Sequence, residues 1–217
     1  SMWRKDRLAA VDFYLVTDSR LTRHGVASDV ALAVGAGCAV VQYREKDAST
    51  RRMVEEARVI RDICRNRALF LVNDRVDVAL ASEADGVHLG QDDMPYADAR
   101  RILGSDAIIG LTVHDEREAE EAECLGADYV GLSPIFPTGT KADAGDACGV
   151  GMIERVRARV AIPIVVIGGI SKKNVADTIL VGADAAVAIS AVVASDDIAR
   201  EVREFREIIL QAKGKRQ

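Results

Sequence analysis

LFLVNDRVDVALASEADGVHLGQDD, residues 69–93, contains two short apolar runs, and each run ends in polar residues. The first run, 69–72, ends at Asn73 and Asp74, and the second, 86–89, leads through a polar turn to Asp93. Between them, residues 75–81 carry enough apolar side chains for about two helical turns. A strand, a helix and a second strand in this order give parallel strands whose carboxyl ends meet at one rim. We therefore expect Asp74 and Asp93 on the same rim, where a pair of carboxylates suggests a hard divalent cation.

The same unit repeats along the whole chain. We expect strands at 13–18, 39–44, 69–72, 86–89, 108–113, 129–133, 163–167 and 185–190. The helices after them are expected at 28–34, 49–65, 75–81, 95–103, 115–125, 150–160, 171–181 and 196–212. Units of this number in about 200 residues are typical of a small (β/α)8 TIM barrel. An open doubly wound sheet is the alternative fold.

Residues 1–217 are then expected to form a single barrel domain with an N-terminal extension at 1–12. Within that extension, residues 3–10 are amphipathic and could pack under the barrel as a plug. Ser1 and Met2 fit a cloning scar before the native start.

The composition excludes several kinds of protein. The net charge of −5 argues against a nucleic-acid surface, which needs clustered and unopposed Lys and Arg. We read the four cysteines, which form no CxxC pair, as reduced thiols of a cytoplasmic protein. The apolar runs are much shorter than the roughly 20 residues of a membrane helix. We therefore expect small-molecule partners, with neither nucleic acid nor membrane.

Polar residues gather where the expected strands end, which is the face that carries the active site in a barrel of this kind. Arg44 and Lys46 lie two residues apart, so on an extended chain their side chains point the same way and could embrace one polyphosphate. Gly168 and Gly169 precede a helix expected to begin at Ser171, so their amides suit a phosphate monoester. The complete rim set is Gln42, Arg44, Lys46, Asn73, Asp74, Gln91, Asp93, Thr112, His114, Thr138, Thr140, Lys141, Gly168, Gly169, Ile189 and Ser190.

Several of these rim segments together resemble one enzyme family. The segments are QYREK at 42–46, NDR at 73–75, GVHLGQ at 86–91 with Asp93, SPIFPTGTK at 133–141, IGGI at 167–170, and Ile189 with Ser190. In this order they are similar to thiamine-phosphate synthases. The resemblance implies a (β/α)8 barrel that joins hydroxymethylpyrimidine diphosphate to a thiazole phosphate, or to its carboxylated form. The products are thiamine phosphate and pyrophosphate, the cofactor is Mg2+, and the enzyme is expected to be a homodimer.

The resemblance also implies a role for individual residues. Asp74 and Asp93 would hold Mg2+, while the catalytic set would be Arg44, Lys46, Lys141 and Thr112, the last standing where serine is common. The remaining substrate-binding set would be Gln42, Tyr43, Glu45, Asn73, Thr138, Gly139, Thr140, Gly168, Gly169, Ile189 and Ser190.

Each interpretation has a simpler alternative. Asp74 and Asp93 could cap helices, and Arg44 with Lys46 could pair with Glu45 and Asp47 on the surface. We interpret His88 as a structural histidine. Because His114 lies on the rim, a thiazole tautomerase on the same barrel is an alternative function, and a non-catalytic barrel that binds a phosphate ligand is another.

Overall fold

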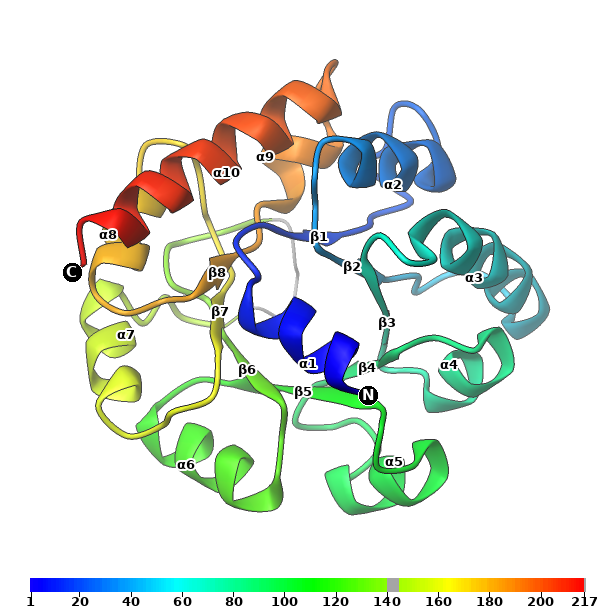
Figure 1. Cartoon of the computed structure of the whole chain (residues 1–217), viewed down its shortest axis with the longest axis horizontal. Coiled ribbons are helices and arrows are strands. Elements are labelled where there is room, and N and C mark those ends of the chain that lie inside the picture. The colour runs from blue at the N-terminus through cyan, green and yellow to red at the C-terminus, as the bar shows by residue number, and fades with distance from the viewer. Residues whose placement is uncertain (140–144, 217) are drawn as a thin grey trace.

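The computed structural model describes residues 1–139 and 145–216, which form a barrel of parallel strands surrounded by helices (Figure 1). Eight strands pair in sequence order, β1 beside β2 and so on to β8. One isolated bridge, between Phe13 and Ala186, joins the two ends of the sheet. The strands are β1 (Tyr14–Val16), β2 (Val40–Tyr43), β3 (Leu69–Asn73), β4 (Gly86–Leu89), β5 (Ile108–Val113), β6 (Tyr129–Leu132), β7 (Ile164–Val166) and β8 (Ala185–Ala186). The predicted TIM-barrel fold is confirmed.

Helices follow the strands and cover the outside of the barrel (Figure 1). Their starts follow local capping: Ser49, Asp115 and Asp197 each accept a hydrogen bond from a backbone N–H of the first turn. The helices are α1 (Met2–Ala9), α2 (Val26–Gly35), α3 (Thr50–Cys64), α4 (Val76–Ser82), α5 (Tyr96–Leu103), α6 (Glu116–Leu125), α7 (Val150–Arg157), α8 (Val175–Leu180), α9 (Ile189–Val193) and α10 (Ile198–Gly214).

Two expected elements near the C-terminus are wrong in their extent. The helix expected from Ser171 begins at Val175, because the Asn174 side chain bonds Ser171 N at 2.8 Å and Gly169 O at 2.9 Å and closes a loop there. The strand expected over 185–190 ends at Ala186, and Ile189 begins α9. The run AAVAI, residues 185–189, is apolar throughout, and such a run has no period that separates strand from helix.

Helix α1 lies in front of the barrel centre in Figure 1. Arg4 fixes it there, since its guanidinium bonds Asp85 at 2.9 Å and the carbonyl oxygen of Asp106 at 2.9 Å. Both partners stand just before strands, β4 and β5, so α1 covers the amino-terminal end of the barrel and Leu8 is buried beneath it. Helix α1 therefore lies at this end of the barrel, and the opposite end is left for the rim. Within residues 1–139 and 145–216 we find no helix with the length and apolar character that crossing a membrane requires.

Asp29 is a buried carboxyl on α2 with an unusual environment. Neither of its oxygens finds a hydrogen-bond partner of normal geometry among the described residues. Burial raises the pKa of Asp29, and nearby Thr22 and His24 offset this only in part. The folded protein therefore binds a proton here at a pH where the unfolded chain has released it.

Because folding raises the pKa of Asp29, its protonated carboxyl adds to the free energy of unfolding at acid pH. That contribution is lost as the pH rises through the pKa of Asp29 in the folded state. Asp29→Asn removes the titration. The free energy of unfolding, measured by urea denaturation from about pH 4 to 7, should fall less steeply with pH in Asp29→Asn than in the parent. Asp98→Asn, on α5 with half of its side chain exposed, is the control. Parallel pH curves for the parent and Asp29→Asn would contradict this expectation.

Candidate active site

Two hollows adjoin at the carboxyl ends of the strands. We call the first the carboxylate pocket; its lining is Arg44, Asn73, Asp74, His88, Gly90, Gln91, Asp92, Asp93, Thr112, His114, Ser133 and Ile167. We call the second the glycine pocket; its lining is Ser133, Pro134, Thr138, Ile167, Gly168, Gly169, Ile170, Val187, Ile189 and Ser190. Ser133 and Ile167 line both, so the two pockets adjoin.

Asp74 and Asp93 face each other in the carboxylate pocket, close enough to share a proton. Burial and the hydrogen bond with Asp74 raise the pKa of Asp93. Burial acts in the same direction on Asp74, but its hydrogen bond with Asp93 and its ion pair with Lys46 outweigh it, so the pKa of Asp74 is lowered. Two carboxyl groups this close repel when both are ionised. A cation between them would remove that repulsion.

The backbone around this pair is shaped to present it. Asp74 has a φ of 62°, an uncommon conformation for a residue with a side chain, and its N–H donates to His88 O at 2.9 Å. The Asp93 carboxylate accepts from Gly90 N at 2.6 Å, within the turn after β4. Neither aspartate caps a helix: the caps of α4 and α5 are Arg75 and Pro95. The capping alternative is therefore wrong.

Two cationic side chains stand beside the carboxylates. Lys46 forms an ion pair with Asp74, and Arg44 lines the pocket without an ion pair to any of the described residues. The alternative that they pair with their acidic neighbours is wrong. Glu45 accepts instead from the backbone N–H of Asp47 at 2.7 Å, and the Asp47 carboxylate pairs with Arg20 at 2.8 Å.

The floor of the carboxylate pocket is polar and hydrogen-bonded. His88 is 4% exposed, and its two ring nitrogens lie 2.8 Å from the Tyr129 hydroxyl and 2.8 Å from the Thr112 hydroxyl. Gln91 bonds the backbone oxygen of Thr112 at 2.6 Å. His114 lies on the rim with its Nδ1 2.9 Å from a Glu118 oxygen. His88 has the contacts expected of a structural histidine, although it also reaches the pocket.

The residues expected from the second strand do not all reach a pocket. Side chains alternate along a strand, so Tyr43 points outward and its hydroxyl donates to Glu56 on α3 at 2.7 Å. Glu45 is held by its own turn. Gln42 points into the barrel, 3% exposed, where its amide donates to the Tyr14 hydroxyl at 2.8 Å. Neither Tyr43 nor Gln42 lines a pocket: the Tyr43 side chain faces α3, and Gln42 lies beneath the floor of the carboxylate pocket.

The glycine pocket is built differently from the expectation. Gly168 and Gly169 adopt φ values of 103° and 65°, and Gly168 O accepts from Phe136 N at 3.0 Å. They stand well before α8, so they are not at a helix N-terminus as expected. The first turn of α9 contributes Ile189 and Ser190 instead.

Some of the remaining predicted site residues line a pocket, and two of them lie outside the part of the chain that the structure describes. Asn73, Thr112 and Thr138 line a pocket, whereas Gly139 is exposed and lines neither. Thr140 and Lys141 lie outside the described residues.

Sequence reasoning did not assign a site role to several of the residues that the structure brings together. His88, interpreted as a structural histidine, lies inside a segment that carries the family resemblance, so that signal was available. For Tyr14 and Tyr129 the sequence offers one signal, their place on expected strands, and that signal does not distinguish a site residue from a core residue.

Comparison with known proteins agrees with this geometry. The sequence profile of the family described as thiamine monophosphate synthase matches residues 13–192. A thiamine-phosphate synthase of Methanosarcina barkeri is 59% identical over 202 residues, which cover 93% of this chain and 92% of that protein. One of Chloroflexus aurantiacus is 48% identical over 198 residues, covering 90% and 91%. A solved thiamine phosphate pyrophosphorylase from Pyrococcus furiosus is 40% identical, with a TM-score of 0.87 and coverage of 95% and 98%.

Proposed function

Because the chain belongs to the thiamine monophosphate synthase family and is a transferase of thiamine biosynthesis, we propose that its two pockets hold the two substrates side by side. The carboxylate pocket would take the diphosphate of hydroxymethylpyrimidine diphosphate, and the glycine pocket the phosphate of the thiazole. The observation that carries this proposal is that Ser133 and Ile167 line both pockets, which places the two pockets side by side.

The residues present suit Mg2+. This ion is usually bound through one or two carboxylates, with substrate phosphates and waters completing the shell. Asp74 and Asp93 supply such a pair, and among the described residues no cluster of three or more His, Cys, Asp or Glu forms a closed cage. When bound, Mg2+ would stabilise negative charge on the departing diphosphate.

The side chains around the pair have separate tasks. Arg44 offers its guanidinium to the diphosphate, and Lys46 turns from Asp74 to the same group once that carboxylate is otherwise neutralised. Lys141 adds charge by family resemblance. Asn73 orients the pyrimidine diphosphate at the rim, and Gln42 does so from beneath the floor. The Thr112 hydroxyl donates to the charge that gathers as the carbon–oxygen bond breaks.

The glycine pocket holds the second substrate in an orientation for attack. Gly168, Gly169, Ile189 and Ser190 provide backbone N–H groups and a hydroxyl for the phosphate. By family resemblance the segment of Thr138, Gly139 and Thr140 adds further donors. The thiazole nitrogen then meets the pyrimidine methylene where the two pockets adjoin, beside Ser133 and Ile167.

The experiment that tests this function is a coupled product assay. The protein is incubated with hydroxymethylpyrimidine diphosphate and thiazole phosphate, with Mg2+ or with a chelator, and thiamine phosphate and pyrophosphate are measured together. Matched formation of both products with Mg2+, and neither with chelator, is expected. Equal rates in the two conditions would overturn the metal assignment. No product from either thiazole form, with the protein folded, would overturn the substrate assignment.

Gly168→Ala is expected to weaken binding of the thiazole phosphate. At φ 103° a side chain is strained, and a Cβ here would stand 2.7 Å from Pro134 Cα, so the pocket wall must move. We expect the KM for thiazole phosphate to rise about tenfold, as about 1.4 kcal/mol of lost binding would give. The KM for the pyrimidine diphosphate serves as the internal control. An equal rise in both constants would contradict the division of the site into two pockets.

We also propose a cellular location and an oligomeric state for this enzyme. We place the enzyme in the cytoplasm, which suits its four unpaired cysteines, two of them buried. From the family resemblance we expect a homodimer, and sedimentation equilibrium would test it.

A further inference from the structure

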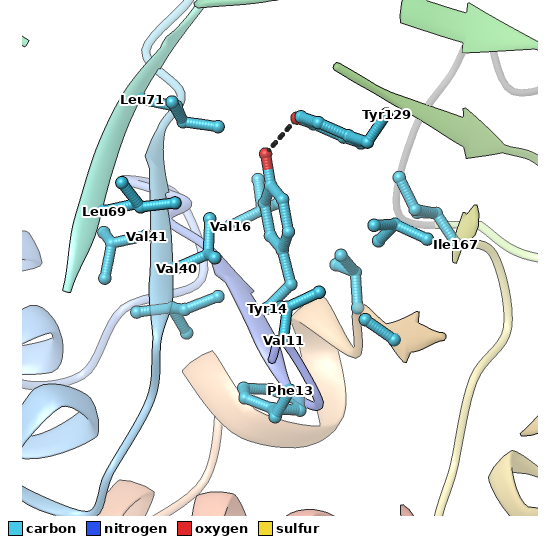
Figure 2. Close-up of a cluster of buried hydrophobic side chains, with 14 of the residues drawn as sticks. Val11, Phe13, Tyr14, Val16, Val40, Val41, Leu69, Leu71, Tyr129 and Ile167 are labelled. Carbon is cyan, nitrogen blue, oxygen red and sulfur yellow. Dashed lines mark hydrogen bonds between the residues drawn. The ribbon is translucent and has the colours of Figure 1, made fainter. Parts of the chain in front are cut away.

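A chain of hydrogen bonds crosses the barrel interior beneath the carboxylate pocket. The Gln42 amide donates to the Tyr14 hydroxyl at 2.8 Å, and that hydroxyl lies 2.6 Å from the hydroxyl of Tyr129 (Figure 2). Tyr129 in turn lies 2.8 Å from His88 Nδ1, and His88 Nε2 lies 2.8 Å from Thr112 Oγ1. We call these five residues the barrel relay. It begins in the core and ends at the pocket.

The first four members of the relay are shielded from water. Gln42, Tyr14, Tyr129 and His88 are each 4% exposed or less, so water does not compete for their hydrogen bonds. Burial raises the pKa of Tyr14 and of Tyr129, which keeps both phenols protonated. Each phenol therefore has one hydrogen to donate, and the donor directions along the relay depend on one another.

The direction follows from the Gln42 end. With the Gln42 amide as donor, only one arrangement gives both phenol hydrogens a partner within the relay. In it Tyr14 donates to Tyr129, and Tyr129 donates to His88 Nδ1. An Nδ1 that accepts from Tyr129 carries no hydrogen, so in this arrangement the imidazole hydrogen is on Nε2, which donates to Thr112 Oγ1. Because Thr112 Oγ1 accepts this hydrogen bond, its own hydrogen points away from His88. Thr112 lines the carboxylate pocket, so this hydrogen is available there.

We propose that Tyr14, Tyr129 and His88 are positioning residues that hold the Thr112 hydroxyl as a hydrogen-bond donor directed into the carboxylate pocket. This inference rests on the proposed function, since it gives a direction to the donor assigned there. A donor oriented in advance is worth more in a reaction that gathers negative charge than one that must first turn. With the relay reversed, Thr112 would donate to His88 and present a lone pair to the diphosphate.

The packing around the relay keeps its geometry fixed. A Cβ on Gly110 would stand 2.1 Å from the Tyr129 ring, so the strand beside the ring has room for glycine and for nothing larger. The Tyr129 ring lies 5.8 Å from that of Tyr14 and 5.5 Å from that of His88, centroid to centroid. At the pocket end, Gln91 bonds the Thr112 backbone. The rings have little freedom to exchange partners.

Nitrogen NMR of the histidine rings tests the direction without reference to activity. The chain has three histidines, and the variants His24→Gln and His114→Gln identify the His88 signals by subtraction. In the parent protein we expect a protonated Nε2 and an unprotonated Nδ1. A protonated Nδ1 with an unprotonated Nε2 would overturn the proposal, whatever the enzyme's activity.

Kinetics of two phenol deletions test whether the relay matters to the reaction. Tyr129→Phe breaks it next to His88, so the single His88 tautomer should be lost and kcat should fall about tenfold, with both KM values within about twofold. Tyr14→Phe breaks it one step earlier, leaves Tyr129 able to donate to His88, and should have a smaller effect of the same kind. It also keeps the test open if Tyr129→Phe does not fold.

Tyr96→Phe is the matched control, since it deletes a half-buried phenol that donates to the Gly126 backbone oxygen at 2.8 Å outside the barrel. It should leave the His88 signals and kcat unchanged. A normal kcat in Tyr129→Phe with a changed tautomer would overturn the positioning role and leave the proposed function standing. A parent protein that forms no thiamine phosphate overturns the proposed function itself, whichever His88 tautomer the NMR shows.

Discussion

Replacing Asp93 by asparagine is expected to abolish thiamine phosphate synthesis, lowering kcat by about 10³-fold. Asparagine has nearly the same size and can still accept the hydrogen bond from Gly90 N, so the turn after β4 should survive. What disappears is the negative charge that, with Asp74, would hold Mg2+. The measurement is the initial rate of pyrophosphate release at saturating substrates and Mg2+.

The control for this variant is Asp98→Asn, a half-exposed aspartate on α5 whose carboxylate pairs with Arg101 at 2.9 Å. Its rate should stay within about twofold of the parent, since exposed pairs contribute little. Urea denaturation of both variants checks that the fold is kept. A near-normal rate in Asp93→Asn would remove this residue from the metal site.

Replacing Gly86 by alanine is expected to destabilise the barrel by more than about 4 kcal/mol, enough to prevent folding at ordinary temperatures. A Cβ at Gly86 would stand 1.8 Å from the backbone oxygen of Ile108, its partner on β5. A flexible side chain could move aside, but a backbone oxygen within a paired strand cannot move without breaking the ladder. Urea denaturation, or the soluble yield if no folded protein forms, measures the effect.

Gly35→Ala is the matched change at the end of α2, where an added Cβ meets nothing within 4 Å. It should be neutral or stabilising by up to about 1 kcal/mol, because alanine favours the helix. Equal stability of Gly86→Ala and Gly35→Ala would show that β4 and β5 adjust more freely than their pairing implies.

The fold was predictable because each strand-helix unit repeats a simple physical pattern. The pattern is an apolar run of strand formers, buried on both faces, followed by a capped amphipathic helix. Neighbouring residues alone are enough to indicate it, as with Ser49 before α3. The errors came where local signals are absent. In 185–190 small apolar residues fit either state, and tertiary contacts decide that Ile189 starts α9. At Ser171 a neighbouring side chain, Asn174, delays the helix.

The site was partly predictable for a related reason. In a barrel of parallel strands the carboxyl ends of all strands meet at one rim, and this rule correctly placed Asp74 beside Asp93. It does not say which way a side chain points, so Tyr43 was expected in the site although it faces α3. The buried contacts of Tyr14 with Tyr129 join residues far apart in the sequence, and no local pattern indicates such a pair.

The closure of the barrel has a consequence for how the molecule opens. β8 has two residues and meets β1 through the single Phe13 bridge, so side chains of α10 hold this seam: Phe205 packs on Phe13 at 5.5 Å, and Arg206 pairs with Asp12 at 3.2 Å. Amide hydrogen exchange should therefore be fastest there among the barrel strands. The chain runs from this seam directly into Ile189 of the glycine pocket. The least tightly hydrogen-bonded part of the wall thus borders the pocket that must release a bulky phosphorylated product after every turnover.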